Sequence, residues 1–135
     1  MPEASALLDA AASVWAKAQI VHESPSWEGH PPARALVEQI AQLPECHDGL
    51  LALLSSPNQL LVAYALQTLE LMGSPALADL PDELLERRQQ VTFQCGSFRN
   101  SMDLGGLARQ VRKRARERGR TAIWPRKSRA RTVEF

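Results

Sequence analysis

The sequence predicts an all-α protein with a single domain of six to seven helices. Three observations lead to this fold class. The length of 135 residues suits one domain with a hydrophobic core. Leucine and alanine supply most of the apolar residues, whereas aromatic residues make up only 5%, and this composition favours helices over strands. Apolar residues also recur at helical spacing between prolines and glycines.

Two helices are predicted in the first third of the chain. Residues 5–22 form the first, with an apolar stripe made of Leu7, Leu8, Ala11, Val14, Trp15, Ala18 and Val21. Residues 23–32 contain three prolines and no period, so they are predicted to form a loop. Pro32 suits the first turn of the second helix, residues 32–43, and Pro44 ends it.

The centre of the predicted fold is a helix over residues 57–72. A short helix over residues 49–55 precedes it, with Asp48 as the expected N-cap. The sequence from Leu60 to Leu66 is entirely apolar or aromatic, and Gly73 is expected to end the helix. Such a helix must be covered by several neighbours.

After this helix, the sequence predicts shorter elements of several kinds. Ser74 and Pro75 begin a short helical turn, and Pro81 begins another helix. Residues 91–95 either finish that helix or form a short extended segment, and residues 96–100 are predicted to form a turn.

A last helix is predicted over residues 103–118, ending at Gly119. One side carries the apolar residues Leu104, Leu107, Ala108, Val111 and Ala115, and arginine and lysine cover the rest. We therefore expect a helical domain over residues 1–119, followed by a basic tail without a period over residues 120–135.

Charge is divided unevenly along the chain. The formal net charge is +1, but residues 1–98 hold four basic and twelve acidic residues, whereas residues 99–135 hold twelve basic and three acidic ones. An acidic body with a basic end can recruit a polyanion, an acidic protein or its own acidic half.

Residues 50–73 resemble a HEAT-type helical repeat. A short apolar helix ends at a polar-proline turn, Ser56-Pro57, and a second helix follows with Leu61, Ala65 and Leu69 four residues apart. Val62 stands where the family commonly has a basic residue. The resemblance implies stacked antiparallel helices whose broad surface binds other macromolecules without catalysis.

Candidate partner-binding residues come from three parts of the sequence. Gln59, Gln67 and Glu70 share the narrow polar face of the central helix. Trp27 in the proline-rich loop can anchor a partner or pack between the first two helices. The C-terminal candidates are Arg109, Arg112, Lys113, Arg116 and Trp124, which can face solvent, bind an acidic protein or dock on an acidic surface of this protein, or contact phosphates and bases.

Catalytic and metal-binding patterns are weak, and we expect neither an enzyme nor a cofactor. His22, His30 and His47 do not pair at helical spacing. Only three residues separate Cys95 from Arg99, whereas a phosphatase loop has five. We expect both cysteines, Cys46 and Cys95, to be free thiols of a cytoplasmic protein that does not span a membrane.

These observations favour a module that binds another protein. A bacterial immunity protein that neutralises a toxin is one such class, suggested by size, helical content and an acidic body. Nucleic-acid binding through the basic C-terminal helix and tail is the alternative, and association of two copies is a further option.

Overall fold

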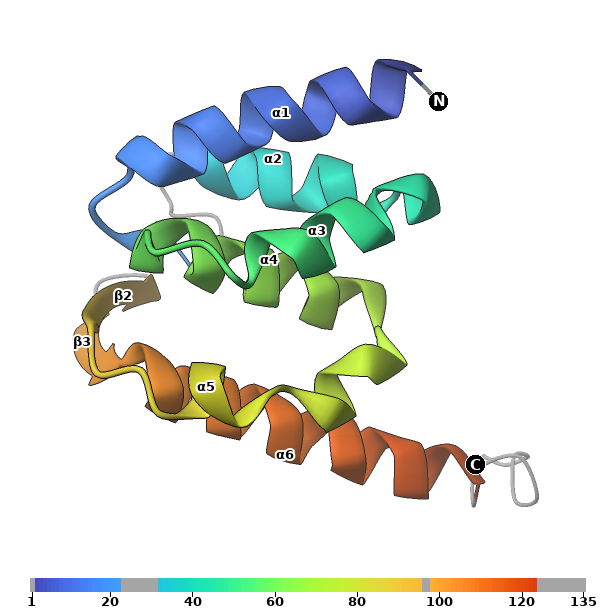
Figure 1. Ribbon diagram of the computed structural model, residues 1–135, viewed down its shortest axis with the longest axis vertical. Helices are drawn as coiled ribbons and strands as arrows, with labels where there is room; N and C mark the ends of the chain where they lie inside the picture. The colour runs from blue at the N-terminus through green and yellow to red at the C-terminus, as the bar shows by residue number, and fades with distance from the viewer. Residues whose placement is uncertain (1, 23–31, 96–97, 124–135) are drawn as a thin grey trace.

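The computed structural model describes residues 2–22, 32–95 and 98–123, and these segments are mostly helical (Figure 1). They contain six α-helices: α1 (Pro2–Lys17), α2 (Pro32–Ala41), α3 (His47–Leu53), α4 (Gln59–Met72), α5 (Asp82–Leu85) and α6 (Leu104–Ile123). Two 3-10 helices are η1 (Pro44–Cys46) and η2 (Pro75–Asp79). Three strands are β1 (Val21–His22), β2 (Gln90–Cys95) and β3 (Phe98–Asp103).

The helices stack as three successive pairs. α1 packs on α2, α3 packs on α4, and η2 with α5 packs on α6. The second members of the pairs also contact one another, since α4 lies against both α2 and α6. Figure 1 shows α1, α3 and α5 in front of their partners. This arrangement is compatible with a helical-repeat fold, in which each pair buries its apolar face against its neighbours.

The hydrophobic core is centred on α4, as the sequence predicts. All residues from Val62 to Leu66 are buried. Trp15 of α1 stacks on Tyr64 of α4, with ring centroids 5.8 Å apart and ring planes 11° apart. Both aromatic side chains are fully buried, and each donates a hydrogen bond to a backbone carbonyl, Trp15 Nε1 to Ala33 and Tyr64 Oη to Ile20. The pair therefore fixes α1 and α2 on the central helix.

The ends of α4 are set by two local signals. Asn58 is the N-cap, and its Oδ1 accepts from the backbone N–H groups of Leu60 and Leu61 at 2.9 and 3.2 Å. Gly73 ends the helix in the left-handed conformation with φ of 73°, which confirms the predicted glycine terminus. The helix begins two residues later than the proline that was predicted to open it.

The fold is not purely α-helical, which corrects the predicted all-α class. Three strands form a sheet in the order β1-β2-β3. β1 pairs with β2 in parallel, and β2 pairs with β3 in the antiparallel direction. Val91 and Phe93 of β2 are buried in the core, while Thr92 and Gln94, which alternate with them, are half-buried. Residues 91–95 therefore take the extended alternative. The predicted turn over residues 96–100 is wrong from Phe98 onward, because β3 begins there.

Several helix boundaries also differ from the predictions. α1 ends at Lys17 instead of continuing to residue 22, because Val21–His22 pairs with β2. α3 begins at His47 after the 3-10 turn η1, so Asp48 lies inside the helix and is not its N-cap. α6 continues past the predicted end at Gly119 to Ile123.

The start of α6 explains the two adjacent glycines in the sequence. The backbone N–H of Gly105 donates to the carbonyl of Arg87 at 2.7 Å, and a β-carbon at Gly105 would collide with the carbonyl of Leu85. The helix therefore approaches the α5 segment closely because residue 105 has no side chain. Asp103 caps the same end through its Oδ1, which accepts from Gly106 N–H at 2.6 Å.

Candidate protein-binding surface

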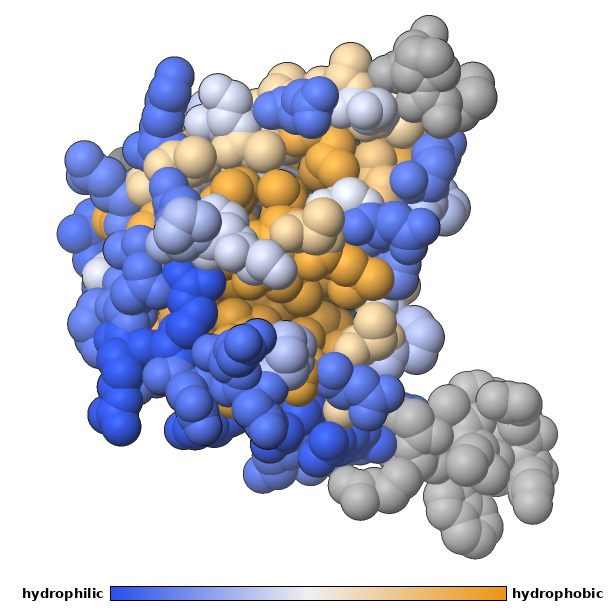
Figure 2. Space-filling model, viewed as in Figure 1, coloured by the Kyte–Doolittle hydropathy of each residue, from blue (hydrophilic) through white to orange (hydrophobic). Residues whose placement is uncertain are grey.

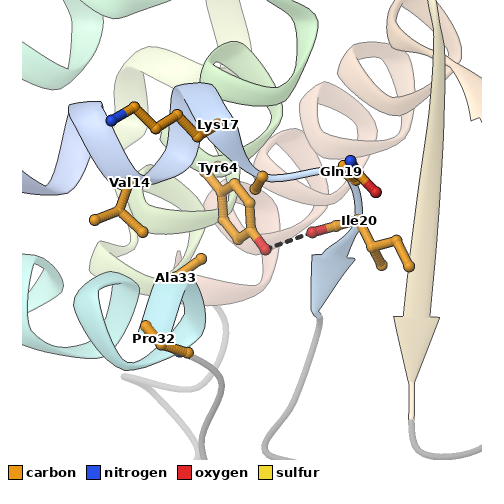
Figure 3. Close-up of a pocket in the computed structure, with 8 residues that line it drawn as sticks. Val14, Lys17, Gln19, Ile20, Pro32, Ala33 and Tyr64 are labelled. Carbon is orange, nitrogen blue, oxygen red and sulfur yellow. Dashed lines mark hydrogen bonds between the residues drawn. The ribbon is translucent and has the colours of Figure 1, made fainter.

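An apolar cleft opens where α1 ends and α2 begins (Figure 3). It has a volume of about 480 Å³ and is lined by Val14, Lys17, Ala18, Gln19, Ile20, Pro32, Ala33 and Tyr64. Figure 3 shows the Tyr64 ring between α1 and α2, with its hydroxyl group turned to the Ile20 carbonyl. Lys17 is the one charged residue among those lining residues. The cleft can receive an apolar side chain or a small apolar group.

A second hollow, of about 270 Å³, lies farther along α2 and α4. It is lined by Arg34, Gln67, Glu70 and Leu71. Gln67 and Leu71 follow Tyr64 by one and two helical turns, and Arg34 follows Ala33, so the hollow and the cleft are neighbours on the same two helices. We call the cleft and this hollow together the α2–α4 surface.

Two features of the hollow are unusual for a surface that faces only water. The Oε1 atom of Gln67 is buried and has no hydrogen-bond partner within the described part of the chain. Leu71 is 52% exposed, although it belongs to the most apolar helix. A buried acceptor without a donor requires an explanation, and a partner that also covers the adjacent leucine would supply one.

The structure brings the predicted residues Gln67 and Glu70 together but keeps Gln59 apart. Gln59 is the first residue of α4, two turns before Gln67, and it is half-buried. Arg34 and Leu71 were not singled out from the sequence. Leu71 lies four residues after Gln67 and so shares a side of the helix with it, but the exposure of Leu71 depends on how the neighbouring helices cover α4.

Glu70 connects α4 to the basic helix α6. Arg114 donates to both carboxylate oxygens of Glu70, at 2.6 and 2.9 Å, and Arg118 lies 3.5 Å from the same carboxylate. These two arginines of α6 are thus held against α4 of the same chain. Because Arg114 is 47% exposed, solvent screening leaves this pair worth less than about 1 kcal/mol.

The predicted basic residues of α6 lie on another side of that helix. Their spacing of i, i+3, i+4 and i+7 places them in one stripe, and we call this the basic strip: Arg109, Arg112, Lys113 and Arg116. The strip is exposed except for the half-buried Arg112, while Leu104, Leu107, Ala108, Val111 and Ala115 are buried against the core. Trp27 and Trp124, the two aromatic candidates, lie outside the described residues.

A serine, a histidine and an aspartate lie close together between α3 and η2, and their contacts are those that join two structural elements. His47 Nε2 lies 2.6 Å from the Ser74 hydroxyl, and that hydroxyl also accepts from Ala76 N–H as the N-cap of η2. Ser74 is buried, and the fully exposed Asp48 lies 3.7 Å from His47 Nδ1, beyond hydrogen-bond distance. The contact therefore ties α3 to η2.

Cys46 is a free, buried thiol whose Sγ lies 3.5 Å from the Ala4 carbonyl. Burial raises the pKa of the thiol, and the neighbouring Glu45 carboxylate adds to the rise. Both effects disfavour the reactive thiolate, so the residue acts as a small core side chain. Among the residues that the structure describes, no group of three His, Cys, Asp or Glu side chains is placed to hold a metal ion.

Comparison with protein-family models, with curated proteins and with solved structures finds no match for this chain. Within the described segments, none of the helices combines the length and apolar character that a membrane crossing requires.

Proposed function

We propose that this protein is a non-catalytic module that binds another protein through the α2–α4 surface. The observation that carries the proposal is the hollow at Gln67 and Leu71, where a buried acceptor without a donor lies beside an exposed leucine. Each feature is unfavourable in the free protein, and one partner segment can satisfy both.

The magnitudes support a partner protein over bulk water. Leaving a buried acceptor unsatisfied costs about 1–3 kcal/mol, which a donor from a partner would recover when the Gln67 side chain turns toward it. Covering the exposed part of Leu71 adds about 1 kcal/mol, roughly half the value of burying a whole leucine. A polypeptide offers both a backbone N–H donor and an apolar side chain.

The neighbouring cleft gives the same partner an anchor point. Its lining is mainly apolar and includes Tyr64, which the stacked Trp15 holds in place. Binding energy at protein interfaces concentrates where a large side chain fills such a pocket. The α2–α4 surface thus combines an anchoring cleft with a polar contact that fixes orientation.

Two narrower assignments belong to this proposal. The stacked helix pairs support a HEAT-like repeat, which residues 50–73 resemble through the turn at Ser56-Pro57 between α3 and α4. We also propose that the partner is a toxin that this protein neutralises, as immunity proteins do. Supporting this are the small helical body and the many exposed carboxylates on it.

The test measures binding to the products of the neighbouring open reading frames. We expect the full chain to form a complex with one of them, and Leu71→Asp to weaken it at least about tenfold, because a charge would be buried at the contact. Gln67→Leu should also weaken it, since a partner donor would lose its acceptor. Isothermal titration calorimetry gives the dissociation constants.

Phe98→Asp is the matched control, because Phe98 is an apolar residue of 81% exposure on β3. Its complex should keep the affinity of the unmodified chain. Absence of any complex, or equal weakening by Leu71→Asp and Phe98→Asp, contradicts the proposed surface. Far-UV circular dichroism checks that all variants remain folded.

A further inference from the structure

The third helix pair carries two strips of opposite charge side by side. The basic strip lies on α6, and an acidic strip follows η2 and α5. The acidic strip consists of Asp79, Asp82, Glu83 and Glu86, all exposed. Figure 2 shows hydrophilic side chains along the lower edge of the molecule, where Figure 1 places α5 and α6.

Contacts between the elements show that the strips are neighbours. α6 packs on both η2 and α5. Arg116 Nε donates to the Ala78 carbonyl at 3.0 Å, next to Asp79. Arg109 and Glu86 line one small hollow of about 130 Å³ at the other end of the strips. The two strips thus run beside each other along the outer side of the pair.

The opposite charges do not neutralise each other within one chain. Across the described segments, no ion pair joins a residue of the basic strip to one of the acidic strip. Within the described part of α6, the arginines that pair with a carboxylate are Arg114 and Arg118, and they lie on another side of the helix. Four cations and four carboxylates therefore remain available to a partner.

We propose that a second copy of this chain docks on these strips and forms a two-fold symmetric dimer. A two-fold axis between the strips places the basic strip of each copy on the acidic strip of the other, so one surface is complementary to itself. The contact is independent of the α2–α4 surface, so dimerisation leaves the proposed binding site of each copy open.

The charge pattern favours a second copy over a nucleic acid. A polyanion approaching the basic strip would meet the four carboxylates beside it, which repel phosphates. A second copy matches both strips at once. Because the charges are exposed, the association should be moderate in strength and sensitive to salt.

Sedimentation velocity of nuclease-treated protein over a concentration series tests the dimer. We expect a reversible monomer–dimer equilibrium at about 50 mM salt, whose dissociation constant rises at least about tenfold at about 500 mM salt. A monomer at every concentration in low salt overturns the proposal. So does a dimer seen only before nuclease treatment, because a nucleic acid would then bridge the copies.

Two charge-reversed variants locate the contact. D82K/E83K brings the net charge of the acidic strip to zero, because Asp79 and Glu86 remain, and R112E/K113E does the same to the basic strip. Each variant alone should be monomeric, whereas an equimolar mixture should form a heterodimer, because the opposite charges face each other again. The control D9K/D48K reverses two carboxylates on α1 and α3 and should dimerise like the unmodified chain.

A mixture that stays monomeric, or a dimer that survives either reversal alone, overturns the assignment of the strips. Leu71→Asp should leave the dimer unchanged. The experiments therefore distinguish an absent dimer from an absent complex with the proposed partner protein.

Discussion

At the scale of single residues, burial decides the chemistry of the cysteine that the structure describes fully. Cys46 is only 2% exposed, and burial followed by the charge of Glu45 raises the pKa of its thiol. The folded protein thus holds the thiol proton to a higher pH than the unfolded chain does.

This difference predicts a loss of stability in alkaline solution. Above the ordinary thiol pKa of about 8.5, the unfolded chain releases the proton while the folded chain keeps it. The free energy of unfolding should therefore fall as the pH rises through that value. Urea unfolding between pH 7 and 10 measures it in a Cys95→Ser background, where Cys46 is the remaining thiol.

The additional change Cys46→Ala is the control for this prediction. It should lower stability at pH 7 through the lost core volume and flatten the alkaline decline. An equal decline with and without the Cys46 thiol would contradict the assigned cause.

The sequence located some residues of the α2–α4 surface and missed others. The polar face of the central helix identified Gln67 and Glu70, because three polar positions interrupt an apolar helix at helical spacing. It did not show that Glu70 is held by Arg114, since 44 residues separate them. Nor could it show the exposure of Leu71, which depends on where α2 and α6 leave α4 uncovered.

At the scale of elements, α4 depends on its N-cap. Asn58 Oδ1 accepts from two backbone N–H groups of the first turn, and its Nδ2 donates to the Ala16 carbonyl of α1 at 3.0 Å. One side chain therefore begins the central helix and ties it to α1.

Replacement of Asn58 separates these two roles. Asn58→Ala should lower the free energy of unfolding by about 1–2 kcal/mol, because it removes the cap and the bond to α1. Asn58→Asp keeps the capping oxygen and should cost less. Urea unfolding monitored by circular dichroism measures both, and equal losses would mean that the cap contributes little.

The strands are the elements that local sequence predicted worst. Residues 91–95 alternate buried and half-buried side chains, a period of two that is too short to exclude the end of a helix. β3 has no such alternation, since its first four residues are all exposed. It is a strand because β2 pairs with it, and local propensity does not predict pairing.

At the scale of the whole molecule, α6 completes the core. Its buried stripe covers η2, α5 and α4, and Glu70 and the Leu85 segment hold it at two places. The basic end of the sequence is thus partly an integral layer of the fold.

Removing α6 should therefore prevent folding. A chain that ends at Asp103 would expose apolar side chains such as Leu77, Leu80 and Leu84, which are buried in the full protein. We expect it to lose the cooperative thermal transition, measured by circular dichroism, that a chain ending at Ile123 keeps. A cooperative transition in the shorter chain would show that the first two helix pairs fold without the third.

The sequence by itself determined the mainly helical fold, the central position of α4 and its end at Gly73, because apolar periodicity and a left-handed glycine act locally. It also determined the opposite charge of the body and the C-terminal helix. Only the tertiary structure decided that Gln90–Cys95 and Phe98–Asp103 pair as antiparallel strands and that Gln67 and Leu71 share a hollow. It also decided that the basic strip runs beside carboxylates it does not pair with. These features depend on contacts between segments far apart in the chain, which no local pattern specifies.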